Sequence, residues 1–162
     1  MGLNFYPRIL SSSALGALSR GADSIVCFTD GSAAVPVERG GIGAVCKFGY
    51  FTVEVGRPIK PPANSYLAEL SAIEMVCDLF PIERELFIYT DCKNLWNILQ
   101  NGHVPKKIPE AIRRVKTKLV EHKATLRFLP NGTRGGAHNR ADRLAGMARI
   151  QNRPFFRIMK AN

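Results

Sequence analysis

Hydrophobic and polar positions along the chain change their period near residue 60, from strand-like runs to helical ones. Residues 24–30, 41–48 and 50–56 are short runs rich in apolar and β-branched residues, and glycines bound or join them. Such runs predict three consecutive strands, the last two forming a hairpin at Gly49.

The segment over 65–80 places apolar residues at helical spacing, which predicts a helix with Ser65 as its N-cap. Residues 85–90 return to a strand, and their unbroken apolar character predicts burial on both faces. Further helices are expected over 91–100, 109–122 and about 139–152, with a fifth strand over 124–129.

The predicted element order is β-β-β-α-β-α-α-β-α. It indicates an α/β fold with a mixed five-stranded sheet, in which a three-strand antiparallel meander is followed by parallel crossovers and helices flank the sheet. Polar sites in such open sheets gather at the carboxyl ends of strands.

A chain of 162 residues suggests one domain, which we place at 24–152. Residues 1–23 form an N-terminal extension with Arg8, Arg20 and a serine run, and it contains no acid before Asp23. This composition resembles an organelle transit peptide, mitochondrial or plastid. The alternative is a disordered or loosely docked tail. Residues 153–162 are expected to be a short C-terminal tail.

The positive charge is concentrated in one part of the chain. Residues 1–101 carry 8 Lys/Arg and 10 Asp/Glu, whereas residues 102–162 carry 15 Lys/Arg and 3 Asp/Glu, for a total of +10. This asymmetry indicates that one part of the chain holds a polyanion. A basic face that only aids solubility is the alternative. No run is apolar enough to cross a membrane, so a membrane partner is not expected.

The four cysteines are spaced too widely for a zinc-binding pattern. Cys27 and Cys46 fall in predicted strands and Cys77 in a predicted helix, so we expect buried free thiols. This fits an intracellular, reducing compartment, which is a mitochondrion or other organelle if residues 1–23 direct targeting and otherwise the nucleus or cytoplasm.

Four acids stand out by their positions in the predicted elements. Asp30 and Asp91 each end an apolar strand, Glu69 lies inside a helix, and Asp142 lies near the start of the last helix. Carboxylates at the ends of buried strands are costly unless a cation meets them, and a divalent metal is the natural partner. Taken singly, each acid has a simpler interpretation as a strand-end, surface or helix-terminal residue.

The segments around these acids resemble the four motifs of type I ribonuclease H, in the same order and on the same kinds of element: Thr29-Asp30-Gly31-Ser32, Ala68-Glu69-Leu70, Tyr89-Thr90-Asp91 and Asn139-Arg140-Ala141-Asp142-Arg143-Leu144-Ala145. The resemblance covers about residues 24–150. The short gap before the last motif is similar to ribonuclease H domains of retroviral and retrotransposon reverse transcriptases.

The resemblance implies a metal-dependent endonuclease that cuts the RNA strand of RNA–DNA hybrids with two magnesium ions, or Mn²⁺ in their place. Two ions about 4 Å apart activate a water and neutralise the leaving oxygen. Asp30, Glu69, Asp91 and Asp142 are then both the catalytic residues and the metal ligands. The partner is an RNA–DNA hybrid or structured RNA; a protein partner cannot be read from the sequence.

Candidate nucleic-acid contacts follow from the same motifs and from the basic helix over 109–122. For that helix, an exposed charged face is the equally simple account. The candidates are Ser32, Asn64, Ser65, Lys93, Asn94, Arg113, Arg114 and Arg134.

The histidine pattern departs from the family. Members usually carry a loop histidine about ten residues before the last acid, and Gly132 holds that position here. His138 is the nearby histidine: it either helps at the leaving phosphate as a catalytic residue or only caps the helix. We favour capping, which predicts slower turnover or an altered metal preference, and little loss of activity in His138→Ala.

Three functions remain open on the sequence alone. The first is an active ribonuclease H, which the four intact acids favour. The second is a catalytically weak or inactive module that binds RNA or hybrid in a larger assembly, which the missing loop histidine favours. The third is a Holliday-junction resolvase-like nuclease on the same fold.

Overall fold

The computed structural model describes residues 12–34, 39–101, 106, 109–130, 133 and 135–161. Its centre is one sheet with the strand order β5-β4-β1-β2-β3-β6. The strands are β1 (Ser24–Ala34), β2 (Arg39–Phe48), β3 (Phe51–Ile59), β4 (Glu85–Thr90), β5 (Thr125–Phe128) and β6 (Phe155–Lys160). Pairs β1–β2, β2–β3 and β3–β6 are antiparallel, while β1–β4 and β4–β5 are parallel. The expected mixed α/β sheet is confirmed.

The prediction of five strands was wrong by one. Residues 155–160, which we expected in a C-terminal tail, pair with β3 at the edge of the sheet. Asn152 ends the preceding helix in a left-handed conformation (φ 50°), which turns the chain back toward β3. The signal in the sequence is weak because an edge strand is half-buried and does not alternate cleanly.

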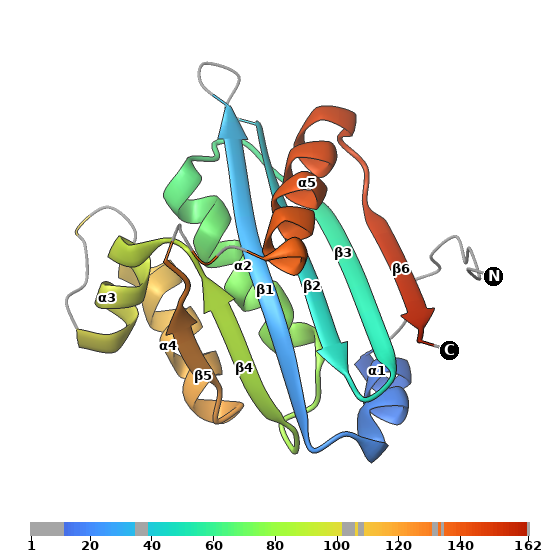
Figure 1. Ribbon diagram of the computed structural model, residues 1–162. Coiled ribbons are helices and arrows are strands. Elements are labelled where there is room, and N and C mark those ends of the chain that lie inside the picture. Colours follow the sequence, from blue (N-terminus) through green and yellow to red (C-terminus); the bar gives the residue numbers. More distant parts are fainter. Residues whose placement is uncertain are drawn as a thin grey trace.

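Helices cover the two faces of the sheet unequally (Figure 1). They are α1 (Ser12–Leu18), the short 3-10 helix η1 (Ser19–Gly21), α2 (Ser65–Leu79), α3 (Lys93–Asn101), α4 (Pro109–Glu121) and α5 (Gly136–Gln151). Of the helices that the structure describes, α5 lies on one face, against β1, β2 and β3. Helix α2 packs on the other face and contacts α4. None of the helices in these described ranges is long and apolar enough to cross a membrane.

The main core lies between the sheet and α2, where Ile25, Ile73 and Ile88 have no exposed surface. Leu15 of α1 also reaches this core, although it belongs to the segment expected to be an extension. All four cysteines are free, and Cys27, Cys46 and Cys77 are buried as expected. Burial raises the pKa of Cys77 to about 12, so this thiol stays protonated.

Glycines in β2 allow α5 to lie directly on the sheet. A Cβ atom on Gly43 would stand 2.2 Å from the Ala141 carbonyl oxygen, and one on Gly41 would stand 2.1 Å from that of Ala145. No real side chain tolerates such distances, so these positions require glycine. The close approach fixes the distance of α5, and with it Asp142, from the sheet.

Two local expectations need correction. The N-cap of α2 is Asn64, whose Oδ1 accepts from the Leu67 amide at 2.7 Å, and not Ser65. Strand β4 is buried on one face only: Leu86 and Ile88 are buried, whereas Phe87 and Tyr89 are half-buried. The physical reason is that α5 contacts β1, β2 and β3, so the apolar residues of β4 on that face lack a covering helix among the described elements.

Candidate metal centre

Three acids from three elements converge at one end of the sheet. Asp30 belongs to β1, Glu69 to α2, and Asp91 directly follows β4. One carboxylate oxygen from each lies within 4.8 Å of the others. The parallel register of β1 and β4 brings the two aspartates to the same end, and the Thr29 hydroxyl donates to the Tyr89 carbonyl at 3.2 Å just before them.

Gly31 explains how Glu69 reaches this point. A Cβ atom on Gly31 would lie 2.3 Å from the Glu69 amide nitrogen and 2.4 Å from the Ala68 carbonyl carbon. Only a residue without a side chain lets the backbone of β1 approach α2 this closely. The Asp-Gly pair is therefore a structural requirement of the cluster as well as a source of one carboxylate.

Asp30 is the most buried of the three clustered acids, with 6% of its surface exposed. Burial raises the pKa of its carboxyl group, and the charge of Asp142 raises it further. A hydrogen bond with Glu69 and one from the Gly31 amide, at 2.8 Å, act in the opposite direction. The net upward shift means that the ionised carboxylate lacks sufficient positive charge nearby.

Asp142 stands apart from the other three acids. It is exposed on α5 and is not a member of the three-carboxylate group, although its charge acts on Asp30. The described residues thus bring three of the four predicted ligands together, with the fourth at their margin.

The donor set suits a hard divalent cation. Carboxylate oxygens are the ligands that Mg²⁺ and Mn²⁺ prefer, and Mg²⁺ commonly keeps several waters beside one or two carboxylates. A cation would also offset the burial and the Asp142 charge, which together raise the pKa of Asp30. Asp30, Glu69 and Asp91 could hold one ion, and Asp142 with Asp30 a second.

His138 is buried against the cluster. Its side chain has no exposed surface, and its Nε2 lies 3.7 Å from Oδ1 of Asp91. The N-cap position of α5 belongs to Gly135, so the interpretation of His138 as a capping residue is wrong. His138 lies on α5, four residues before Asp142, and this helix brings its imidazole next to Asp91.

Comparison with known proteins decides the family. A family model described as RNase H matches residues 22–148. The chain belongs to the RNase H family. Among solved structures it is similar to LC11-RNase H1, isolated from compost by a metagenomic approach, with a TM-score of 0.63 and 17% identity over 80% of this chain and 98% of that one. At that identity the likeness concerns the fold. The comparison with curated proteins gave no significant match.

The RNase H motif at β1 has a neighbour that sequence reasoning missed. Nε of Arg149, on α5, donates to Oγ of the predicted contact Ser32 at 3.0 Å. Arg149 follows Asp142 by seven residues, which places both on the same side of a helix. That spacing was the signal available in the sequence. The hydrogen bond places the Arg149 guanidinium near the C-terminal end of β1.

Four of the other predicted contacts in this RNase H chain lie at the starts of two helices. Asn64 and Ser65 are exposed at the beginning of α2, one turn before Glu69, and Lys93 and Asn94 are exposed at the beginning of α3, just after Asp91. These side chains therefore adjoin the acids through short stretches of chain. Arg134 lies outside the described residues.

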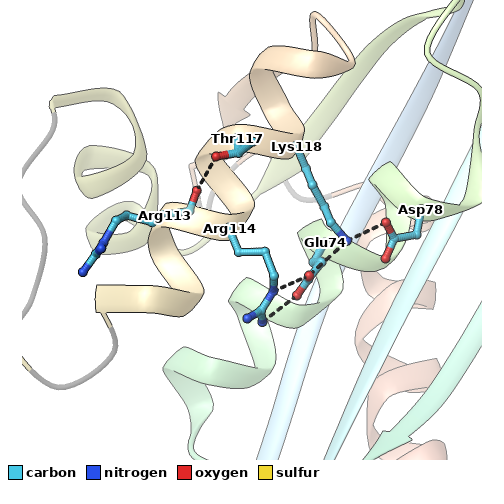
Figure 2. Close-up of polar contacts among 6 residues, drawn as sticks. All are labelled: Glu74, Asp78, Arg113, Arg114, Thr117 and Lys118. Atoms are coloured by element: carbon cyan, nitrogen blue, oxygen red, sulfur yellow. Dashed lines mark hydrogen bonds and ion pairs between the residues drawn. The ribbon is translucent and has the colours of Figure 1, made fainter.

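The two arginines predicted on α4 differ in their surroundings (Figure 2). Nε of Arg114 lies 2.6 Å from Oε1 of Glu74 and its Nη2 3.1 Å from Oε2, so it forms a bidentate pair with α2. Lys118 joins this pair and Asp78. Arg113 points away from this network and is exposed. The pairing gives Arg114 a structural role in holding α4 on α2.

The same network acts on the acid. Burial alone would raise the pKa of Glu74, but the hydrogen bonds from Arg114 and Lys118 outweigh it and hold the pKa below its usual range. Glu74 is therefore a paired structural acid and differs in this from Asp30, whose pKa is raised.

Proposed function

We propose that this chain is a metal-dependent endonuclease that hydrolyses the RNA strand of RNA–DNA hybrids by a two-metal-ion mechanism. The observation that carries the proposal is the convergence of Asp30, Glu69 and Asp91 within 4.8 Å in a chain of the RNase H family. The raised pKa of Asp30 supports it, because a carboxylate held in such surroundings gains most from a bound cation.

In this proposal Asp30, Glu69 and Asp91 would hold one Mg²⁺, and Asp30 with Asp142 would hold the other. The bound ions would supply activation of a water and charge stabilisation of the leaving 3′ oxygen. Mn²⁺ accepts the same ligands. The exposed position of Asp142 suits a ligand at the solvent-facing margin of the site.

The residues of the chain orient the reacting groups. Asp30 is the most buried of the four proposed ligands and accepts a hydrogen bond from the Gly31 amide, so its carboxylate has a fixed direction. His138 lies behind Asp91 and acts as a positioning residue for that carboxylate. With no exposed surface in this structure, the imidazole is better placed to orient Asp91 than to touch the leaving phosphate.

Substrate contacts are proposed on both sides of the acids. Ser32 and Arg149 form a polar pair near the end of β1, suited to a phosphate or a 2′-hydroxyl of the RNA strand. The exposed Asn64, Ser65, Lys93 and Asn94 flank Glu69 and Asp91 in the chain. Arg113 and Arg134 are proposed as weaker phosphate contacts, and Arg114 becomes available only if its pair with Glu74 opens.

The direct test is cleavage of a labelled RNA–DNA hybrid in Mg²⁺ or Mn²⁺, beside RNA duplex, single-stranded RNA and a four-way DNA junction. Cleavage of the RNA strand in the hybrid alone supports the proposal. Tight hybrid binding without cleavage in either metal would favour a binding module, and cleavage of the junction would favour a resolvase-like nuclease.

A further inference from the structure

The face of the sheet that carries α5 also bears an aromatic surface beside that helix. We define the aromatic surface by Val26 and Phe28 of β1, Phe87 and Tyr89 of β4, and Arg127 of β5. The first four are half-buried and Arg127 is exposed. In Figure 1, α5 crosses the β1–β3 side of this face, while β4 and β5 lie beyond it.

The strand register makes these residues one continuous surface. Val26 pairs with Phe87, Phe28 with Tyr89, and Tyr89 with Arg127. The rings of Phe28 and Tyr89 are stacked, with centroids 5.2 Å apart and planes 18° apart.

Arg127 extends the rings with a flat cation. Its guanidinium carbon lies 4.8 Å from the centroid of the Phe87 ring, and its Nη1 donates to the Tyr89 hydroxyl at 3.1 Å. Nucleic-acid bases stack in proteins on aromatic rings and on arginine guanidinium groups. The aromatic surface offers both.

The aromatic surface continues directly into the candidate metal centre. Side chains alternate along a strand, so Asp30 lies on the same face as Phe28, and Asp91 follows Tyr89 by two residues. Two residues of strand span roughly 7 Å. A nucleic-acid strand that crosses the acids therefore reaches the rings within about one nucleotide.

We propose that the aromatic surface stacks unpaired nucleotides of the RNA strand where it leaves the RNA–DNA hybrid. The inference rests on the proposed function, because that function places the RNA strand at Asp30 and Asp91. Among the described residues no helix covers these apolar side chains, and an exposed apolar patch of this kind is typical of a binding surface. The net charge of +10 and the cationic Arg127 favour a polyanionic partner over an apolar one.

The test compares the affinity of the full-length Asp30→Asn protein for a blunt RNA–DNA hybrid with its affinity for the same hybrid carrying a short RNA overhang, by fluorescence anisotropy in Mg²⁺. We expect the overhang on one end to tighten binding about tenfold, the size expected for stacking of one base. Adding Arg127→Gln or Tyr89→Leu should bring this ratio close to one. Tyr50→Ser serves as the matched control, because Tyr50 is an exposed aromatic residue (75%) at the β2–β3 turn and should keep the ratio.

Each result has one meaning. A ratio near one in the parent protein, or an equal ratio in the Arg127→Gln protein, would overturn the inference. A hybrid with a DNA overhang of the same length is measured in the same series, and a gain from that overhang alone would also overturn it. Self-association of the parent protein that Arg127→Gln abolishes, seen by sedimentation, would assign the surface to a second copy of the chain. Cleavage of the blunt hybrid by the wild-type protein tests the proposed function separately, so failure of one does not imply failure of the other.

Discussion

At the scale of single residues, Asp30 links the sequence to the chemistry. Only 6% of its surface is exposed, and it lies beside Glu69. Burial and the charge of Asp142 raise the pKa of its carboxyl group. A structural acid would be expected to find a cationic partner inside the protein, as Glu74 does with Arg114 and Lys118. In the proposed function Asp30 instead gains its positive charge from a bound cation.

This arrangement predicts that Asp30→Asn stabilises the metal-free protein while removing activity. Because the folded-state pKa of Asp30 is raised, the folded protein loses stability as the pH rises from the ordinary aspartate range, about 3.9, through the raised value. Asparagine avoids this loss. We expect thermal unfolding in EDTA at pH 7 to occur a few degrees higher, since about 1 kcal/mol corresponds to roughly 2–4 °C in a chain of this size.

The advantage of Asp30→Asn should shrink as the pH falls toward 4, where aspartate is neutral in both states. Added Mg²⁺ should raise the unfolding temperature of the wild-type protein and not that of the variant. Asp23→Asn, at an exposed position, should change neither property. A lower unfolding temperature for Asp30→Asn at pH 7 would contradict this account.

The position of His138 changes the expectation drawn from its sequence context. As a capping residue it would be dispensable, but it is buried 3.7 Å from a carboxylate oxygen of Asp91. We now expect His138→Ala to lower kcat by about 10–100-fold and to raise the Mg²⁺ concentration needed for half-maximal activity. The reason is that residues which orient a metal ligand affect activity and metal affinity by this amount. His122→Ala, which removes a histidine at the end of α4, should leave both unchanged. Full activity and unchanged Mg²⁺ dependence in His138→Ala would restore the dispensable role.

At the scale of elements, the site depends on how α5 is held against the sheet. Glycines of β2 set the distance of α5 from the sheet. Ion pairs of the buried Glu54 set the position of α5 along β3. Glu54 of β3, 4% exposed, accepts from Arg140 of α5 at 3.0 and 2.9 Å, and its Oε2 also lies 2.9 Å from Arg157 of β6. The strand absent from the sequence prediction thus takes part in holding the helix that carries Asp142.

This network predicts unequal effects of its two arginines. Arg140→Met removes a bidentate partner and leaves a largely buried carboxylate with one cation, which should lower the free energy of unfolding by about 3 kcal/mol. Arg157→Met leaves the bidentate pair intact and should cost roughly 1 kcal/mol. Urea denaturation at pH 7 measures both. Equal losses, or a larger loss for Arg157→Met, would show that the network is not organised around Arg140.

At the scale of the whole molecule, the periodicity of the chain predicted the main elements and the mixed sheet. The four-motif resemblance found Asp30, Glu69 and Asp91 because each stands at a strand end or on a patterned helix. Features made by contacts between distant segments were not readable. Strand β6 pairs with β3 across a hundred residues, and the bond between Arg149 and Ser32 joins residues 117 apart.

Solvent exposure was the least readable property. The unbroken apolar run of β4 looks like a doubly buried strand, and only the position of α5 shows that one of its faces is left without a helix. Likewise Glu54 reads as an outward-facing polar residue, because its cover comes from β6 and α5. In both cases the tertiary neighbours, and not the local pattern, decide burial.

We propose that Asp30, Glu69 and Asp91 hold the metal with which this protein cuts RNA in a hybrid. The most direct measurement is the single-turnover rate of hybrid cleavage in Mg²⁺ by the wild-type, Asp30→Asn and Asp23→Asn proteins. We predict cleavage of the RNA strand by the wild-type and Asp23→Asn proteins at similar rates, and a loss of at least about a hundredfold in Asp30→Asn. Equal rates in all three proteins, or no cleavage by the folded wild-type protein, would contradict the claim.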